Sequence, residues 1–251
     1  METPAPSRRR SAGFTLVELS IVLAIIGLLV GGIAALRGYT RSAGITTMMN
    51  ESKYFIDAFN QFQTRYSSPP GDYKNASVAW TGAGNGDGNG LIRAGSAPLT
   101  AELYYVFQHL AKAGFIPGTY TGAANSNGGA SIGTNVPGSA MGAVAFMFDH
   151  PDATDGNVSG DALYFDGFYG NVLRVAGLDD NSAVTPAKAF LTTKQAYQLD
   201  DKYDDGQPGT GNITTPISTA LSGCATSAAT TALYTQSNSE LKVCYFLIRL
   251  Q

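Results

Sequence analysis

The sequence has little charge and few of the side chains that most enzymes use. Only 14% of its 251 residues are charged, and it contains two histidines, two cysteines and one tryptophan. It carries no Walker motif, no zinc-ligand spacing and no dinucleotide fingerprint. These absences weigh against nucleotide-dependent and zinc-dependent enzymes. The abundance of apolar residues (44%) and the 30 glycines instead favour an exported, loop-rich protein that contains β-structure.

A basic surface is also missing. The net charge is −3, and three of the 16 basic residues are Arg8, Arg9 and Arg10, so the rest of the chain is more acidic than the whole. A mildly acidic body argues against nucleic acid as the main partner. It suits an extracytoplasmic domain, or one that collects cations.

One segment formally matches a hydrolase motif. Residues Gly129–Gly133, "GASIG", have the Gly-x-Ser-x-Gly spacing of a nucleophile elbow, which needs a strand before it and a helix after it. The flanking "NSNGG" and "TNVPG" predict loops instead. We expect His109 on a helix surface and His150 in a turn, so neither histidine supports a catalytic pair, and we predict that the protein is not an enzyme.

A long apolar run follows the three arginines. The stretch "RRRSAGFTLVELSIVLAIIGLLVGGIAALRGY" has no charged residue between Leu19 and Leu36, which is the length of a membrane-spanning helix. The basic cluster should stay cytoplasmic and send the C-terminal bulk outward. No Ala-x-Ala cleavage site follows the run, so we expect it to remain in the mature protein. Glu18 lies in its first turns, where a carboxylate in hydrocarbon needs a partner.

The residues around this carboxylate carry a family resemblance. The segment "GFTLVELSIVLAIIGLL", Gly13–Leu29, closely resembles the processing site of type IV prepilins and type II secretion pseudopilins. The resemblance implies that a prepilin peptidase cuts between Gly13 and Phe14 and that Phe14 becomes N-methylated. Glu18, the fifth residue after the cut, matches the family's glutamate. That glutamate is implied to pair with the N-terminal amine of a neighbouring subunit.

The resemblance also implies a function, a location and a set of partners. The chain would be a structural subunit of a bacterial type IV pilus or type II secretion pseudopilus. Its precursor would cross the inner membrane once with the head outside the cytoplasm, and the mature form would lie in a periplasmic or extracellular filament. The implied partners are the peptidase, the inner-membrane assembly platform, and other pilins or copies of itself.

The helix is predicted to continue beyond the apolar run. Mostly apolar residues recur at three- and four-residue steps from Ile45 to Tyr66, which indicates an amphipathic helix with one apolar stripe. Pro69 and Pro70 then end the helix. We therefore predict a leader (1–13), a membrane or filament-core helix (14–38), an amphipathic second half (39–68) and a globular head (69–251).

The head is predicted to add short helices and strands. The family resemblance implies that these form an α+β, pilin-like fold, with one long N-terminal helix packed on a small antiparallel sheet. Residues 125–142 read as a loop rich in Gly, Ser and Asn. The helices are expected at Thr100–Gly114 and at Thr192–Gly206, the second with a threonine cap at its start. The strands are expected at Ala143–Phe148, Ala162–Asp166, Asn171–Gly177 and Lys242–Leu250.

The two cysteines and several acidic turns are candidate stabilising sites. In an oxidising compartment Cys224 and Cys244 should form a disulfide, and the alternative is two buried thiols. Calcium is the one candidate cofactor. Asn85, Asp87 and Asn89 alternate as in the first half of an EF-hand loop, but Ser96 stands where that loop has its bidentate glutamate. Asp204 and Asp205 form a second candidate site, by a looser resemblance to calcium loops of pseudopilin heads.

A different class of function remains open. The chain could be a membrane-anchored or filament-tip binding module, such as an adhesin or a calcium-dependent receptor, that uses the pilin-like helix only for delivery. Homopolymeric filaments would favour a structural subunit. A tip-only location with ligand binding by the head would favour a binding module.

Overall fold

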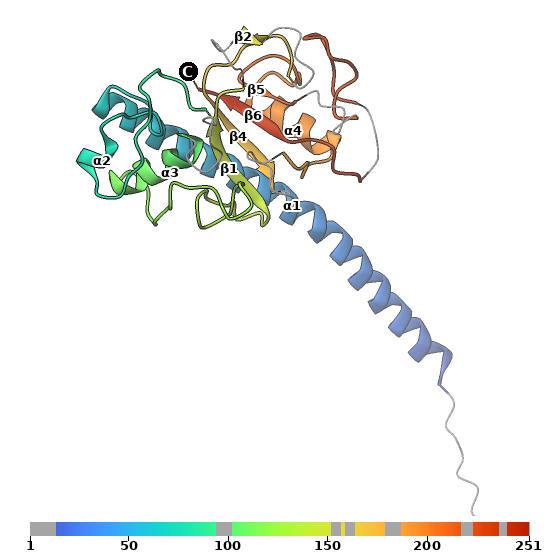
Figure 1. Ribbon diagram of the computed structural model, residues 1–251. Helices are drawn as coiled ribbons and strands as arrows, with labels where there is room; N and C mark the ends of the chain where they lie inside the picture. Colours follow the sequence, from blue (N-terminus) through green and yellow to red (C-terminus); the bar gives the residue numbers. More distant parts are fainter. Residues whose placement is uncertain are drawn as a thin grey trace, which may run out of the picture. The chain divides into compact units, whose positions relative to one another are not determined.

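The computed structural model describes residues 14–93, 102–151, 157–158, 164–178, 187–216, 223–235 and 240–250, and for residues 33–42 and 157–158 it covers the backbone alone. The chain divides into two units, Met1–Gly44 and Ile45–Gln251 (Figure 1). Helix α1 (Leu16–Tyr66) contributes residues to both.

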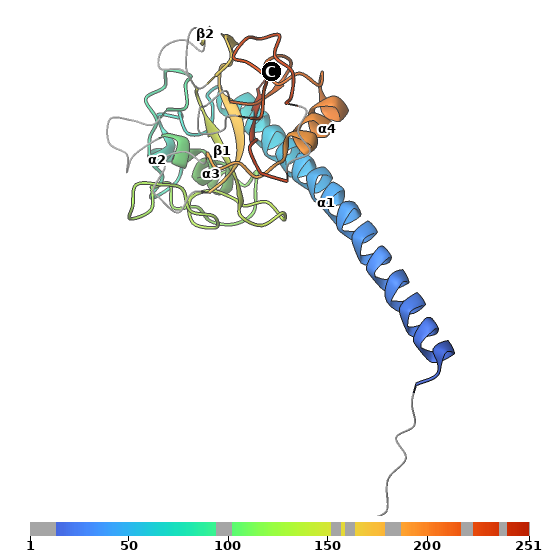
Figure 2. The same cartoon turned by 90° about the vertical axis from the view of Figure 1, so that its right-hand side faces the viewer.

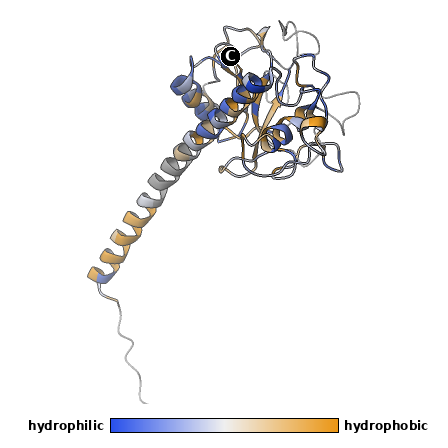
Figure 3. Cartoon of the chain, turned by 90° about the vertical axis from the view of Figure 1, so that its left-hand side faces the viewer, coloured by the Kyte–Doolittle hydropathy of each residue, from blue (hydrophilic) through white to orange (hydrophobic). Residues whose placement is uncertain are grey.

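The first unit consists of the N-terminal part of α1. Its side chains from Phe14 to Gly32 are all exposed, and most are apolar, as the hydropathy colouring shows (Figure 3). Among the helices of the described residues, none combines the length and the apolar character needed to cross a membrane. The predicted span over residues 14–38 includes 33–38, whose side chains lie outside the described part.

The second unit begins with the amphipathic half of α1. The predicted stripe is confirmed, because Met48, Phe55, Phe59 and Phe62 are buried along one face. The helix ends at Tyr66, three residues before the paired prolines, as predicted. Its buried face therefore forms one wall of the head's core.

A four-stranded antiparallel sheet forms the centre of the head, and the fold is α+β as predicted (Figures 1 and 2). Its strands lie in the order β1-β4-β6-β5. Strand β4 pairs with β1, with Phe146 opposite Val175, and with β6, with Leu173 opposite Ile248. The strands are β1 (Val144–Asp149), β4 (Val172–Gly177), β5 (Ile213–Thr214) and β6 (Phe246–Arg249).

Three of the four predicted strands are confirmed as β1, β4 and β6. The prediction of a strand over Ala162–Asp166 is wrong for its described residues, 164–166. The extended pairing starts only at β3 (Gly167–Phe168), which forms a short hairpin with β2 (Asn157–Val158). The Tyr164 hydroxyl instead accepts a hydrogen bond from Arg174 at 2.8 Å. The two-residue strand β5 had no recognisable pattern of its own.

Aromatic rings join α1 to the sheet and to α3 (Glu102–Lys112). The Phe55 ring packs on Phe107 of α3 at 5.5 Å between centroids and on Phe146 of β1 at 5.0 Å. The Phe59 ring stacks on Phe148 at 4.8 Å. Each such ring buries a large apolar area, so these contacts dominate the cohesion of the head.

Helix α4 (Thr193–Tyr203) begins with the threonine cap that the sequence predicted. The Thr192 hydroxyl accepts a hydrogen bond from the Gln195 amide, and the Gln195 side chain accepts one from the Thr192 amide. This reciprocal arrangement is a capping box. The remaining helix, α2 (Ala76–Ala79), is a single turn that the sequence did not predict.

The Cys224–Cys244 disulfide is formed, and both residues are buried. It closes the loop onto the segment that leads into β6. The Leu191 and Cys244 backbones also bond to one another, so the bridge lies against the segment before α4 as well.

The expected surface position of His109 is wrong. His109 is fully buried: its Nδ1 accepts a hydrogen bond from the Gly71 amide at 2.9 Å and its Nε2 donates to the Gly84 carbonyl at 2.8 Å. Burial lowers the pKa of His109 to about 4, so the ring is neutral and links two loops to α3. His150 is also buried, at the end of β1.

Candidate functional site

The start of α1 is organised by two side chains. Glu18 accepts hydrogen bonds from the Thr15 amide at 3.1 Å and from the Thr15 hydroxyl at 3.0 Å. In return the Thr15 hydroxyl accepts one from the Glu18 amide at 3.2 Å. Thr15 and Glu18 therefore form a capping box, which satisfies amides that a helix start leaves unpaired.

The apolar side chains around this carboxylate are exposed in the part of the chain that the structure describes. Phe14 is 88% exposed and Leu16 is 87% exposed, and Glu18 is exposed as well. Of the predicted processing pair, Phe14 is the first described residue and Gly13 lies outside the described residues. The sequence analysis missed Thr15, although the Thr-x-x-Glu spacing "TLVE" was a sufficient signal for a cap.

The first predicted calcium loop is arranged differently from an EF-hand half-site. The Asn85 carboxamide bonds to Ser77 through both its oxygen and its nitrogen. The Asn89 oxygen accepts from the Leu91 amide, and its nitrogen donates to Asp87. The two asparagines therefore stabilise local turns, and Asp87 is the member of this predicted set that lies in an acidic cluster. Ser96 lies outside the described residues.

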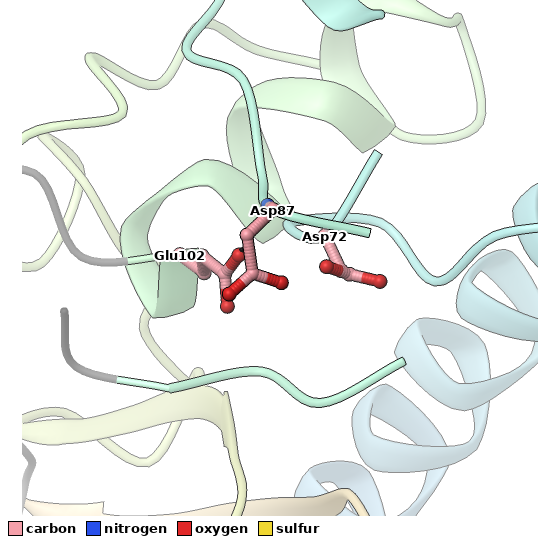
Figure 4. A group of neighbouring side chains, drawn as sticks. All are labelled: Asp72, Asp87 and Glu102. Carbon is pink, nitrogen blue, oxygen red and sulfur yellow. Dashed lines mark hydrogen bonds between the residues drawn. The ribbon is translucent and has the colours of Figure 1, made fainter. Parts of the chain in front are cut away.

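That cluster joins Asp87 to Asp72 and Glu102, which come from separate parts of the chain (Figure 4). One carboxylate oxygen from each lies within 4.8 Å of the others. Asp72 is almost fully buried, and its Oδ1 accepts from the Gly88 amide at 2.6 Å and its Oδ2 from the Gly90 amide at 2.8 Å. Its position ties the segment after α1 to the glycine-rich loop.

Glu102 holds the same loop from the other side. Its two oxygens accept from the Asp87 amide at 2.8 Å and the Arg93 amide at 3.3 Å. Burial, opposed by these bonds and assisted by the charges of Asp87 and Asp72, raises the pKa of Glu102 to about 7. Burial also raises the pKa of Asp72. Backbone amides bind the Asp72 and Glu102 carboxylates, so these two residues stabilise the loop.

A second cluster lies at the end of α4, where Asp200 joins the predicted Asp204 and Asp205. Asp204 Oδ2 accepts from the Ile213 amide at 2.8 Å, and the two oxygens of Asp205 accept from the Gln207 amide and the Thr210 hydroxyl. These bonds fold residues 204–213 into a tight turn that brings the three carboxylates together.

Asp200 is the unusual member of this second cluster. It is fully buried, and its Oδ2 accepts from the Tyr234 hydroxyl at 2.8 Å. Its Oδ1 is buried without a hydrogen bond to any described residue. Burial raises the pKa of Asp200 to about 7, and the charges of Asp205 and Asp204 add to that rise. The sequence analysis missed Asp200, although its spacing of four from Asp204 on a predicted helix was a signal.

The hydrolase-like segment carries no comparable arrangement. Ser131 lies in a loop in which its carbonyl accepts from the Asn135 amide, and Ile132 pairs with Val136 in an isolated bridge. No strand-to-helix turn surrounds it among residues 125–142.

Comparison with known proteins identifies the N-terminal segment. A family model described as the prokaryotic N-terminal methylation motif matches residues 8–34, and this motif is the signature of type IV pilins and pseudopilins. The match spans the predicted processing site and the start of α1. Neither the curated proteins nor the solved structures gave a match to the chain. The motif points to a family of structural subunits with a membrane-anchored precursor.

Proposed function

We propose that this chain is a structural subunit of a type IV pilus or a type II secretion pseudopilus. The observation that carries the proposal is the methylation motif at residues 8–34, which covers the exposed apolar segment of α1 with its one carboxylate, Glu18. The precursor would be held in the inner membrane with its head outside the cytoplasm. After processing it would join a periplasmic or extracellular filament through the assembly platform.

Assembly would bury the apolar surface between Phe14 and Gly32. In a bundle of such helices, the glycines at positions 27, 31 and 32 would allow close approach, because they carry no side chain. Nothing in the described chain lies within 4 Å of a Cβ placed at these positions, so they are open to a neighbouring helix. Glu18 cannot enter a dry bundle unpaired without a large cost. Cleavage after Gly13 would create a new ammonium group at Phe14, and that group on a neighbouring copy supplies the missing cation.

The capping box suggests how Glu18 is held before assembly. In the single chain the Thr15 amide and hydroxyl donate two hydrogen bonds to the Glu18 carboxylate, so Glu18 has a local partner before assembly. Docking would exchange or supplement this neutral partner with an ammonium group. The charge-assisted bond is the stronger one, which favours the assembled state.

Mass spectrometry of native protein tests the processing step. We expect an N-terminus at methylated Phe14 and no residues from the leader. Gly13→Ala should reduce processing only mildly, whereas Gly13→Leu should block it, because a peptidase must approach the backbone closely at this position. An intact leader on the surface-exposed protein would contradict the proposal.

A calcium-dependent head is a second candidate property. It is supported by the buried Oδ1 of Asp200, which has no hydrogen-bond partner within standard distance among the described residues and lies in a cluster with Asp204 and Asp205. Carboxylate oxygens are the ligands that Ca²⁺ prefers. The predicted ligands Asn85 and Asn89 receive less support, because their side chains are engaged in turns.

Calorimetric titration of the full chain with calcium chloride tests this second property. Asp205→Asn should weaken binding by about tenfold or more, since it removes a ligand charge. Asp201→Asn is the matched control, because Asp201 is an exposed neighbouring carboxylate outside the cluster. Absence of calcium binding by the unaltered chain would remove this candidate and leave the filament proposal standing.

A further inference from the structure

A cavity lies where the chain leaves α1. Its volume is about 430 Å³, which falls in the range of small-molecule sites. It belongs entirely to the head. We call it the Tyr73 pocket. Its lining includes Tyr66, Ser67, Asp72, Tyr73, Lys74 and Asn75.

Two tyrosines give the Tyr73 pocket an aromatic wall. The rings of Tyr66 and Tyr73 are partly exposed, and their centroids are 5.4 Å apart. Trp80 supports both rings, at 5.3 Å from Tyr66 and 5.9 Å from Tyr73. Such rings offer an apolar face together with a hydroxyl group, which suits a ligand that has both C–H faces and polar edges.

Several polar groups of the pocket have no partner in the part of the chain that the structure describes. The side chains of Ser67, Tyr73, Lys74 and Asn75 make no hydrogen bond there. Asn75 precedes α2 without capping it, so its carboxamide is free to donate and to accept. The pocket therefore presents hydroxyl, amide and ammonium groups beside two aromatic rings.

The walls are fixed before any ligand arrives. The Gly71 amide donates to His109, and the Gly88, Asn89 and Gly90 amides all donate to Asp72. Ser67 adopts a left-handed backbone with φ of 52°, which is uncommon for a residue other than glycine, asparagine or aspartate. Backbone held in this way often marks a functional site, and a preformed wall lowers the entropic cost of binding.

The charges decide the class of ligand. The Asp72 carboxylate already accepts three backbone amides, so it is a weak attractor for an ammonium ligand, and it repels phosphate. Lys74 is the single cation of the lining and opposes a cationic ligand as well. We propose that the Tyr73 pocket binds a neutral saccharide, whose ring stacks on Tyr66 or Tyr73 and whose hydroxyls bond to Lys74 and Asn75.

Saturation-transfer NMR on the full chain tests the proposal. The probes are glucose, galactose and N-acetylglucosamine, each as the free sugar and as its methyl glycoside. The chain is kept in a detergent without a sugar headgroup, since a glycoside detergent would compete. We expect transfer to the ring protons of at least one sugar. A preference for the methyl glycoside would indicate the end of a glycan, and a preference for the free form a free sugar.

Variants locate the binding. Asn75→Ala and Lys74→Ala alter exposed side chains with no structural bonds, and each should weaken binding by about tenfold while the head stays folded. Tyr73→Ala should abolish it. Tyr197→Ala, an exposed tyrosine outside the pocket, should leave affinity unchanged. Absence of transfer to every sugar, or equal loss in Tyr197→Ala, overturns the proposal. So does transfer to choline, offered as a further probe, but to no sugar, if Tyr73→Ala removes that transfer.

Discussion

The hydroxyl of Tyr234 donates a hydrogen bond of 2.8 Å to Oδ2 of Asp200, and both side chains are buried. Tyr234 lies in the loop closed by the disulfide, whereas Asp200 lies on α4, 34 residues earlier. One bond thus joins the covalently closed loop, the helix and the second acidic cluster. The stability of these three features should therefore be coupled, and pH should act on all of them.

Asp200 predicts a pH dependence of stability. Its pKa is about 7 in the folded chain and near 3.8 when unfolded, so the folded state holds the proton more tightly. Stability should therefore fall as pH rises from about 4 to 7 and level off above 7. Asp200→Asn should remove this loss, because the amide can accept from Tyr234 and donate to the neighbouring carboxylates. At pH 8 it should gain on the order of 1–2 kcal/mol after solvent screening.

Thermal unfolding between pH 4 and 8 measures this effect. Glu102 has a raised pKa in the same range, so the difference between the unaltered chain and Asp200→Asn isolates Asp200. Asp201→Asn, on the same helix but exposed, should follow the profile of the unaltered chain. If the Asp200→Asn profile still falls by the same amount, the carboxylate is ionised without penalty in the folded head.

The disulfide is expected to hold the closed loop in place. Few residues between Cys224 and Cys244 are large and apolar, so burial alone gives the loop little anchorage. Cys224→Ser should lower the free energy of unfolding by about 3 kcal/mol, the effect expected for a loop of this size. Membrane insertion of the precursor should not change. Free alkylation of both cysteines without reductant would show that packing, rather than the bridge, holds the loop.

A buried ion pair between strands β1 and β4 should contribute to the stability of the folded head. Arg174 on β4 donates from Nε at 3.0 Å and from Nη2 at 2.6 Å to Oδ2 of Asp149 on β1. Tyr164 and Tyr245 accept further bonds from the same guanidinium. Arg174→Met would leave a buried unpaired carboxylate and should cost about 3–5 kcal/mol in urea unfolding.

The double variant Arg174→Met with Asp149→Leu provides the control for this pair. It removes both charges, so most of the lost stability should return. If the double variant is as unstable as Arg174→Met, the guanidinium acts mainly through its contacts with the two tyrosines.

Glu18 allows helix capping to be separated from filament docking. Glu18→Gln keeps a side chain that can complete the capping box with Thr15, but it removes the charge. Glu18→Ala removes both. If the carboxylate pairs with a neighbour's amine, both variants should insert normally and both should lose most filament yield, measured from sheared surface fractions. Normal filaments from Glu18→Gln with loss in Glu18→Ala would assign Glu18 to the helix cap alone.

Much of the backbone could be predicted because its signals are local. The apolar stripe from Met48 to Phe62, the prolines after Tyr66 and the Thr192 cap each act within a few residues, and their elements are confirmed. Strands β1, β4 and β6 were recognisable because each is a short run of apolar residues between turns. The strand expected at Ala162–Asp166 is absent from its described residues, 164–166, where the Tyr164 hydroxyl accepts a hydrogen bond from Arg174 and the backbone pairs with no strand.

The sequence by itself determined the processing motif, the two halves of α1 and the pairing of the only two cysteines, since each depends on neighbouring residues or on simple counting. Only the tertiary structure decided which polar groups meet. Asp72, Asp87 and Glu102 come from three separate segments, and their spacing in the sequence does not predict that they meet or that loop amides bind them. His109 was expected at a surface because a helix pattern cannot show that two loops cover it. Long-range packing sets burial, and burial in turn sets charge and hydrogen bonding.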